Sequence, residues 1–211
     1  MREPALIFDF GNVVAFFDYL KACERLGPKL GLTAEAFRRR IVERGFAPLL
    51  GRFESGKIGP EAFAAEVMVL SGVTLPYDEF VDAWQDIFWL NEPVARLIDR
   101  LKSAGYTLLL GSNTNILHST HYRRQFASTL NLFDRLVLSH DVGHMKPSSE
   151  FYHACVRAAG LPAASCIFVD DLAENVDGAR KAGLIGVHYI DTPALITDLT
   201  GLGVKIAASG A

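Results

Sequence analysis

The stretch ALIFDFGNV, residues 5–13, joins a short apolar run to an aspartate, a glycine and an asparagine. An uninterrupted apolar run such as Ala5 to Phe8 is typical of a strand that is buried on both faces of a sheet. Four later runs have a similar length and a similar preference for branched and aromatic residues, which favours strands. These runs are Tyr106 to Leu110, Arg135 to Leu138, Cys166 to Val169 and Gly186 to Ile190. We therefore predict five strands, the first of which leads into the turn at residues 9–13.

Helical patterns separate the later apolar runs. The apolar residues from Val94 to Leu101 recur at the spacing of one helix face, and Pro93 suits the first turn of that helix. A second pattern begins at Phe151, with Ser148 as a candidate N-cap. Strands that alternate with helices imply a parallel sheet that is covered by helices on both faces. We predict an α/β fold with a Rossmann-like parallel sheet.

The segment from Asp18 to Asn91 breaks this alternation. It carries helix-like patterns with Gly and Pro residues between them, and it offers no convincing strand. We predict that it forms a small α-helical bundle, inserted after the first strand and placed over the strand ends. The expected α/β core covers residues 1–15 and 92–211, and the expected helical cap covers residues 16–91.

Composition and charge limit the partners of the chain. Its 211 residues carry a formal net charge of −3, which gives no broad positive field for a nucleic acid. The apolar stretch from Ala5 to Leu20 is interrupted by polar and charged residues and lacks a small-residue cleavage site, unlike a signal peptide. No run of 18 apolar residues is present, so we expect no membrane span. We expect neither a nucleic acid nor a membrane as a partner.

Three cysteines, Cys23, Cys155 and Cys166, are scattered along the chain without a paired spacing. An odd number of unpaired cysteines outside a secretory context predicts reduced thiols, buried as small apolar groups. We therefore expect a cytoplasmic protein. The tail after Thr200, which ends in residues 207–211, is expected to fray.

Polar side chains follow four of the predicted strands at the point where each strand ends. Asp9 follows the first strand, and Ser112 and Asn113 follow the second. Lys146 lies in the loop after the third strand, and the Asp170-Asp171 pair follows the fourth. Ligands bind beyond the carboxyl ends of parallel strands, so we expect all of these side chains at one rim of the sheet.

This rim would bring together the three carboxylates of Asp9, Asp170 and Asp171. Such carboxylates repel one another unless a cation holds them ionised. Oxygen ligands of this kind suit octahedral Mg²⁺, whereas no cluster of His and Cys in the sequence suggests zinc. The Ser112 hydroxyl and the Lys146 ammonium suit a dianionic phosphoryl group. The residues therefore predict Mg²⁺ as the cofactor and phosphoryl transfer as the chemistry.

The order of these motifs resembles that of the haloacid dehalogenase superfamily: Asp after strand one, Ser-Asn after strand two, Lys-Pro after strand three and Asp-Asp after strand four. Each motif alone is weak, but four in the right order at strand ends are strong. The helical insert resembles the cap of one large subclass, so the resemblance covers the whole chain. More narrowly, Asp-x-Gly-Asn-Val, Ser-Asn-Thr-Asn and Asp-Asp-x-x-x-Asn resemble a bacterial subgroup that includes an α-glucose-1-phosphate phosphatase.

The resemblance implies a nucleophile and a set of metal ligands. Asp9 would attack phosphorus and form an aspartyl-phosphate, which splits hydrolysis into two steps. Asp9 would also ligate Mg²⁺, together with the Gly11 carbonyl and Asp171. Asp170 would be a further ligand, either directly or through water, and would be a candidate to pair with Lys146.

The resemblance also assigns the phosphate contacts and the partner. Ser112 and Asn113 would hold the phosphoryl oxygens, and Lys146 would be a catalytic and phosphate-binding cation. Asn175 is expected to support Asp171 from the start of a helix. The implied activity is Mg²⁺-dependent hydrolysis of a small phosphate monoester, with a small phosphorylated metabolite as the partner and a monomer or homodimer as the assembly.

The chain departs from the superfamily pattern at Gly11. The general pattern has an Asp at this position, which gives a proton to the leaving oxygen and then takes one from water. A group in that role commonly contributes about 10² to 10⁴ in rate. One compensation is a leaving group that needs less help, such as the anomeric hydroxyl of a sugar 1-phosphate. Another is a substitute carboxylate, for which Asp18 is the nearest candidate, although it is also suited to cap the first helix of the insert.

Three other functions remain open from the sequence. A 2-haloacid dehalogenase would attack carbon with the same Asp9 and needs no metal, although Asp170 and Asp171 would repel its carboxylate substrate. A non-catalytic protein that binds a phosphate ligand would explain Gly11. A receiver domain is disfavoured because its acidic pair should follow the first strand.

We expect His118, on the helix after Ser112, to support the site rather than to act in catalysis.

Overall fold

The computed structural model describes residues 3–206 and contains the predicted parallel sheet. The strands β1 (Ala5–Phe8), β4 (Thr107–Ser112), β5 (Arg135–Leu138), β6 (Cys166–Asp170) and β7 (Ile185–His188) lie in the order β5-β4-β1-β6-β7. Each neighbouring pair is parallel. The central strand β1 is completely buried, as its unbroken apolar sequence predicts. The α/β fold class is therefore confirmed.

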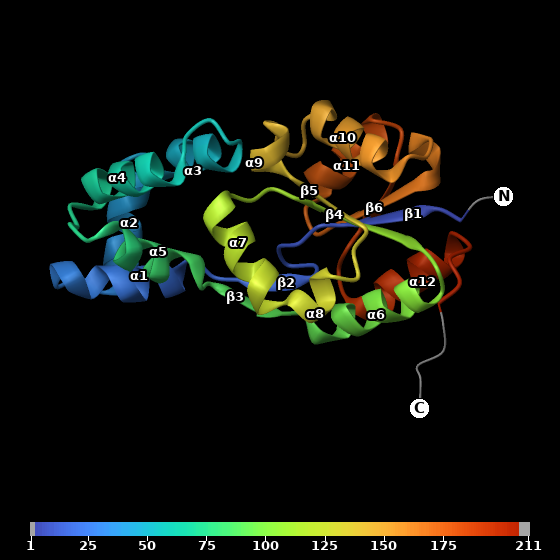
Figure 1. The fold of residues 1–211 in the computed structure, drawn as a ribbon, viewed down its shortest axis with the longest axis horizontal. Coiled ribbons are helices and arrows are strands. Elements are labelled where there is room, and N and C mark those ends of the chain that lie inside the picture. Colours follow the sequence, from blue (N-terminus) through green and yellow to red (C-terminus); the bar gives the residue numbers. More distant parts are fainter. Residues whose placement is uncertain (1–2, 207–211) are drawn as a thin grey trace.

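Helices cover both faces of the sheet (Figure 1). Leu6 and Phe8 point to one face, where they pack in the same cluster as Leu97 of α6. Ile7 points to the other face, where its cluster includes Phe151 of α10. The first face carries α6 (Glu92–Ser103), α7 (Ile116–Gln125), α8 (Ala127–Leu130) and α12 (Thr192–Gly201), and the second carries α9 (Ser139–Val142), α10 (Ser149–Ala159), the short η2 (Ala163–Ser165) and α11 (Ala173–Lys181).

Local sequence signals explain where two of the core helices begin. Pro93 lies in the first turn of α6, where its fixed φ angle suits a helix and its missing N–H is not needed. Asn115 caps α7, because its side-chain oxygen accepts a hydrogen bond from the main-chain N–H of His118. Ser148 stands at the N-cap position of α10 as predicted, but its hydroxyl makes no capping hydrogen bond.

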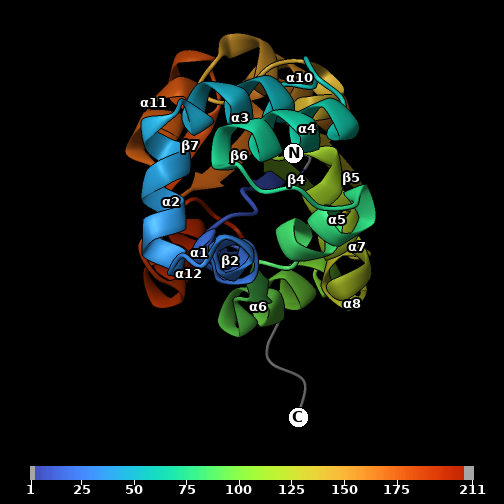
Figure 2. The ribbon, with the colours of Figure 1, turned by 90° about the vertical axis from the view of Figure 1, so that its left-hand side faces the viewer.

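The predicted helical insert packs as a bundle beside the core (Figures 1 and 2). Aromatic rings fill its centre: Phe53 stacks on Phe63 with ring centroids 4.2 Å apart, and Trp84 meets Phe63 edge-on at 5.1 Å. Such ring pairs stabilise a bundle beyond the burial of their area. The insert consists of α1 (Leu20–Leu26), η1 (Gly27–Leu30), α2 (Ala34–Glu43), α3 (Phe46–Glu54), α4 (Pro60–Ser71) and α5 (Tyr77–Gln85).

Two short strands join the insert to the core, and the sequence analysis predicted neither of them. β2 (Ala15–Phe17) pairs antiparallel with β3 (Phe88–Leu90), which lies inside the segment where we predicted no strand. Each strand has only three residues, too few to show an alternating pattern. The predicted boundaries of the core and the cap fall at the ends of this strand pair, and we propose them as the division of the chain.

The remaining expectations concern the cysteines, the tail and the membrane. All three cysteines are buried and free of disulfide bonds, as predicted. The tail does not fray at Thr200, because Val204 is buried and the main-chain N–H of Lys205 donates a hydrogen bond to the Tyr106 hydroxyl. Residues 207–211 lie outside the described range. Within residues 3–206, none of the helices is both long and apolar enough to cross a membrane.

Candidate active site

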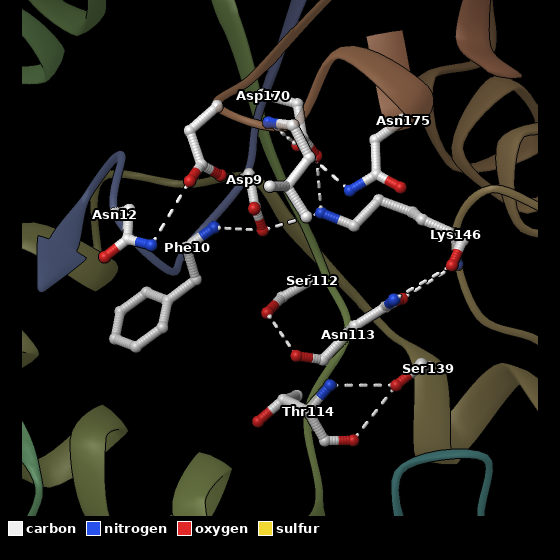
Figure 3. A network of polar contacts seen from close by, with 12 residues as sticks. Asp9, Phe10, Asn12, Ser112, Asn113, Thr114, Ser139, Lys146, Asp170 and Asn175 are labelled. Atoms are coloured by element: carbon white, nitrogen blue, oxygen red, sulfur yellow. Dashed lines mark hydrogen bonds and ion pairs between the residues drawn. The ribbon is translucent and has the colours of Figure 1, made fainter. Parts of the chain in front are cut away.

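The predicted acidic residues meet at the carboxyl ends of β1 and β6 (Figure 3). Asp9 follows β1 directly, and its main-chain N–H donates a 2.8 Å hydrogen bond to the Val169 carbonyl, which continues the strand pairing. Asp170 is the last residue of β6. One carboxylate oxygen from each of Asp9, Asp170 and Asp171 lies within 4.8 Å of the other two. The expectation that these three side chains share one rim therefore agrees with the structure.

Lys146 lies between two of these carboxylates. Its Nζ atom is 2.7 Å from Asp9 Oδ1 and 2.7 Å from Asp170 Oδ2, and its side chain is only 1% exposed. Burial alone would lower the pKa of Lys146, but the two neighbouring carboxylates outweigh burial and raise it. The ammonium therefore stays charged and makes strong, charge-assisted hydrogen bonds.

One ammonium does not balance three carboxylates. Burial raises the pKa of Asp9 to about 7, against the opposing effect of Lys146 and with a further increase from Asp170. The pKa of Asp171 is also raised, first by burial. An excess of negative charge on oxygen donors is what a hard divalent cation relieves. The chemistry of this donor set therefore fits Mg²⁺.

Asp170 is held from several sides. Its Oδ1 atom accepts hydrogen bonds from the Leu172 main-chain N–H at 2.9 Å and from the Asn175 side-chain amide at 3.0 Å, while its Oδ2 atom accepts from Lys146. Asn175 therefore supports Asp170, and our prediction that it supports Asp171 is wrong. The helix α11 begins at Ala173, three residues after the end of β6 at Asp170. Asn175 therefore lies in the first turn of α11, close to Asp170.

Asp171 is supported by Asn12 instead. Asn12 has a φ angle of +57°, in the left-handed region that Asn tolerates better than most residues. This conformation directs its side-chain amide to Asp171 Oδ2 at 3.2 Å. The turn quoted at the opening of the sequence thus connects the end of β1 to the end of β6.

Ser112 and Asn113 occupy the end of β4, as predicted. Ser112 is 2% exposed, and its hydroxyl donates a 3.3 Å hydrogen bond to the Asn113 carbonyl. The Asn113 side chain is bonded at both ends to the main chain of Lys146: its oxygen accepts from the N–H at 2.8 Å, and its nitrogen donates to the carbonyl at 3.0 Å. Asn113 therefore fixes the loop that carries Lys146 (Figure 3).

A cavity of about 60 Å³ lies where the cap meets this rim. Gly11 and Ser112 line it from the core, Phe17 and Tyr19 from the junction, and Glu54 from the cap. The other lining residues are Phe10, Phe88, Asn113, Thr114 and His118. A cavity of this size holds a few water molecules, so it suits a small polar group next to the carboxylates.

His118 supports this cavity. Its Nε2 atom lies 3.2 Å from the Trp84 carbonyl, and its Nδ1 atom lies 3.0 Å from the side-chain nitrogen of Asn115. The amide and the carbonyl fix the tautomer, because the amide must donate to Nδ1 and Nε2–H must donate to the carbonyl. Burial lowers the pKa of His118 to about 3, so the ring stays neutral. Its nitrogens are thus committed to the α5–α7 contact, in agreement with the expected supporting role.

Asp18 does not face this cavity. Its Oδ1 atom accepts a 2.8 Å hydrogen bond from the main-chain N–H of Leu20, the first residue of α1, although Tyr19 and not Asp18 occupies the N-cap position. It lines a different hollow, of about 330 Å³, together with Arg38 and Trp84 of the cap. Asp18 is therefore a poor substitute for the missing carboxylate at Gly11.

The sequence analysis missed Glu54 and Ser139. Glu54 is the last residue of α3, and neither periodicity nor spacing distinguishes it from the other charged residues of the insert. Ser139 begins α9, and its hydroxyl contacts both the Glu54 carbonyl and Thr114. These contacts depend on how the cap docks on the core, which local sequence patterns do not report.

Comparisons with known proteins show the family of the chain. A family model for haloacid dehalogenase-like hydrolases matches residues 4–183. A phosphatase of Mycobacterium tuberculosis is 27% identical over the whole of both chains. The D-ribitol-5-phosphate phosphatase of Bacteroides thetaiotaomicron is 30% identical over 185 residues, which cover 84% of this chain and 87% of the relative. A solved haloacid-dehalogenase-family enzyme from Bacteroides thetaiotaomicron, in complex with magnesium and inorganic phosphate, has a TM-score of 0.74 at 21% identity, covering 90% of this chain and 95% of that one.

Proposed function

Because the chain belongs to the haloacid dehalogenase-like hydrolases and is a phosphoric monoester hydrolase, we propose that it hydrolyses a small phosphate monoester through an aspartyl-phosphate on Asp9. The observation that carries this proposal is the position of Lys146 Nζ, 2.7 Å from both Asp9 and Asp170. The ammonium holds the Asp9 carboxylate at the rim, beside the Ser112 hydroxyl and the cavity. Asp9 is thereby oriented for attack on a phosphoryl group bound there.

Mg²⁺ is the proposed cofactor. Asp9, the Gly11 carbonyl and Asp171 would hold it, because the carboxylates of Asp9 and Asp171 lie close together and carry negative charge that Lys146 alone does not balance. We assign Asp170 a contact with the metal through water, since its two oxygens already accept three hydrogen bonds. The bound metal would neutralise charge on the phosphoryl oxygens.

The chain's own residues would hold the phosphoryl group. The Ser112 hydroxyl would exchange its long bond to the Asn113 carbonyl for a phosphoryl oxygen, and the Lys146 ammonium would contact another. Asn113 would contact the phosphoryl group through its main-chain N–H, because its side chain is already hydrogen-bonded to the main chain of Lys146. These donors would favour charge that spreads over the phosphoryl oxygens during transfer.

The proposed substrate is a small phosphorylated metabolite with a leaving group that departs readily, such as a sugar 1-phosphate. The cavity beside Gly11 is small and polar on its core side, and Gly11 supplies no proton to the leaving oxygen. An anomeric hydroxyl is more acidic than an ordinary alcohol and needs less protonation. Comparing kcat/KM for glucose 1-phosphate and glucose 6-phosphate tests this choice, and a preference for the 6-phosphate would overturn it. The buried, reduced thiols support a cytoplasmic location.

The experiment that tests the function is a panel of phosphate esters, assayed for phosphate release with Mg²⁺ and with EDTA. We expect turnover that requires Mg²⁺ and is lost in Asp9→Asn. Activity that survives EDTA, together with halide release from a 2-haloacid, would instead favour the dehalogenase. If no ester is hydrolysed while beryllium fluoride still binds, the chain is a phosphate-binding protein without turnover.

A further inference from the structure

Phosphate ester hydrolysis needs a proton carrier that the β1 turn does not provide. The oxygen that leaves phosphorus must gain a proton, and the water that attacks the phosphoenzyme must lose one. Gly11 has no side chain to do this, and a side chain there would collide with Phe17, because a Cβ atom at Gly11 would lie 2.8 Å from Cε1 of that ring. The proton carrier must therefore reach the site from another element.

Glu54 reaches the site from the cap. It lines the same cavity as Gly11 and Ser112, and its carboxyl group is close enough to Lys146 for the ammonium to lower its pKa against the effect of burial. It is partly buried at the end of α3, and its Oε1 atom accepts a 3.5 Å hydrogen bond from the Tyr19 hydroxyl. The contact with Tyr19 is long, so the carboxyl group keeps capacity for another partner.

The main chain at Glu54 is fixed to the core. The Ser139 hydroxyl donates a 2.5 Å hydrogen bond to the Glu54 carbonyl and accepts one from the main-chain N–H of Thr114 at 2.9 Å. Gly56, with a φ angle of +67°, approaches the His140 carbonyl so closely that a Cβ atom there would collide with it. The end of α3 and the loop after it are therefore docked on α9, which directly follows β5 (Figure 1). This contact fixes the main chain at Glu54.

The surroundings of Glu54 suit a group that carries a proton. Burial raises the pKa of Glu54 to about 7, against opposing effects of the Tyr19 hydroxyl and the Lys146 ammonium. A general acid and base works best when its pKa lies near the working pH. Of the other titratable side chains that line the cavity, His118 is neutral with its nitrogens engaged, and burial raises the pKa of Tyr19 well above its usual value.

We propose that Glu54 is the general acid and base of the reaction, acting from the cap in place of the carboxylate that Gly11 lacks. This inference rests on the proposed phosphatase function. In the first step, Asp9 forms a bond to phosphorus while the bond to the ester oxygen breaks, and Glu54 gives its proton to that oxygen. In the second step, water forms a bond to phosphorus and the bond to Asp9 breaks, while Glu54 takes a proton from the water. Alcohol and phosphate leave, and Glu54 is protonated again.

The test compares two esters of similar shape in wild-type protein with Mg²⁺ and in Glu54→Gln. 4-Nitrophenyl phosphate releases an acidic phenol that needs no proton, whereas 4-nitrobenzyl phosphate releases an alcohol that does. We expect Glu54→Gln to lower kcat/KM for the benzyl ester by about 10² to 10⁴, and kcat/KM for the phenyl ester by less than about threefold. With the phenyl ester, the variant should release a burst of nitrophenol and accumulate phosphoenzyme, because the second step has lost its base.

Glu61→Gln is the matched control, since Glu61 is an exposed carboxylate on the next cap helix. It should leave both esters unaffected. Equal losses on both esters in Glu54→Gln, or no loss on either, would overturn the role of Glu54 while leaving the phosphatase function intact. A wild-type protein that hydrolyses neither ester would overturn the phosphatase function itself.

Wild-type protein gives an independent test that does not depend on a variant that folds. For the benzyl ester, kcat/KM should decline on the alkaline side as Glu54 loses its proton, and this decline should be absent for the phenyl ester. The same alkaline decline with both esters would contradict the proposal, because Tyr19, Lys146 or another group common to both reactions would then be responsible.

Discussion

At the scale of single residues, Gly11 determines that the turn after β1 carries no side chain that could transfer a proton. The Phe17 ring packs close to the missing side chain, because a Cβ atom at position 11 would lie only 2.8 Å from Cε1 of that ring. An aspartate at position 11 would therefore have to displace Phe17, which packs on Tyr19 and Phe88. The position of the Phe17 ring thus depends on a glycine at position 11. We propose that the proton carrier comes from the cap instead.

The contact between Gly11 and Phe17 predicts a stability effect. Gly11→Ala should lower the free energy of unfolding by about 1–3 kcal/mol, as overpacking commonly does. Gly51 is the matched control, because it lies in α3 with open space around its Cα atom, and Gly51→Ala should stabilise the helix by about 0.5–1 kcal/mol. Urea unfolding measures both. Equal changes in the free energy of unfolding at the two positions would show that the Phe17 ring moves aside without cost.

The raised pKa of Glu54 predicts a pH dependence of stability. A carboxyl group whose pKa is about 7 when folded, against 4.5 as its ordinary value, binds its proton more tightly in the folded state. Its contribution is thus fully present below pH 4.5 and is lost as the pH rises through 7. Between pH 5 and pH 8, in EDTA, wild-type protein should lose about 1–3 kcal/mol relative to Glu54→Gln, allowing for partial exposure.

Urea unfolding at the two pH values measures this difference directly. Glu61→Gln, which changes an exposed carboxylate, should follow the wild type at both pH values. If the wild type and Glu54→Gln change in parallel between pH 5 and pH 8, Glu54 is ionised at neutral pH and unsuited to act as an acid.

Sequence reasoning found the residues that follow strands but not those that come from the cap. Asp9, Lys146 and Asp170 were predictable because strand order alone places them at one rim. Glu54 was not, since its place in the cavity depends on the contact between two elements that are 85 residues apart at Ser139. Asn175 was assigned to the wrong carboxylate, because only the geometry of the turn after β6 decides which oxygen it meets.

At the scale of elements, the contact between α3 and α9 joins the cap to the core. Ser139 is completely buried, and its hydroxyl bonds to Thr114 on the core side and to Glu54 on the cap side. The five sheet strands were predictable because each contains a short run of apolar residues. The strands β2 and β3 were harder to predict, because each has only three residues and so shows no periodic pattern. In addition, the two strands pair across the whole length of the insert.

Removing the Ser139 hydroxyl should loosen this contact. Ser139→Ala leaves the buried Thr114 N–H without its partner and should cost about 1–3 kcal/mol of stability. It should also lower kcat, because Glu54 loses its fixed position. Ser103→Ala, at an exposed position near the end of α6, is the control for urea unfolding and for activity. A Ser139→Ala protein with unchanged stability and kcat would show that the α3–α9 contact is dispensable.

At the scale of the whole molecule, the cap closes over the core and divides the chemistry between them. The core carries the three carboxylates, Ser112 and Lys146, and Glu54 of the cap lines the cavity together with Ser112. Figure 2 shows the helices of the cap in front of the core. The cavity of about 60 Å³ holds only a few water-sized groups, so entry of the proposed phosphate ester should require the cap to move away from the rim. Substrate entry and proton transfer are therefore linked, because closure brings Glu54 to the leaving oxygen.

Metal binding should stabilise the folded protein. The carboxylate cluster exists only when β1 and β6 are paired, so the proposed Mg²⁺ should bind the folded chain and raise its free energy of unfolding by about 2.7 kcal/mol at a concentration of 100 Kd. Thermal unfolding with and without Mg²⁺ measures the shift. Asp171→Asn should reduce it, whereas Asp177→Asn, an exposed position on α11, should not. Equal shifts in both variants would place the metal elsewhere.

The most direct test of the central claim is to trap the phosphoenzyme. Wild-type protein with Mg²⁺ is mixed with radiolabelled 4-nitrophenyl phosphate, whose leaving group needs no proton, quenched in acid within the first turnover and digested to peptides. We predict that the label is found on the peptide that contains Asp9, that Glu54→Gln accumulates more of it, and that Asp9→Asn forms none. Label on another residue, or full turnover by Asp9→Asn, would contradict the account.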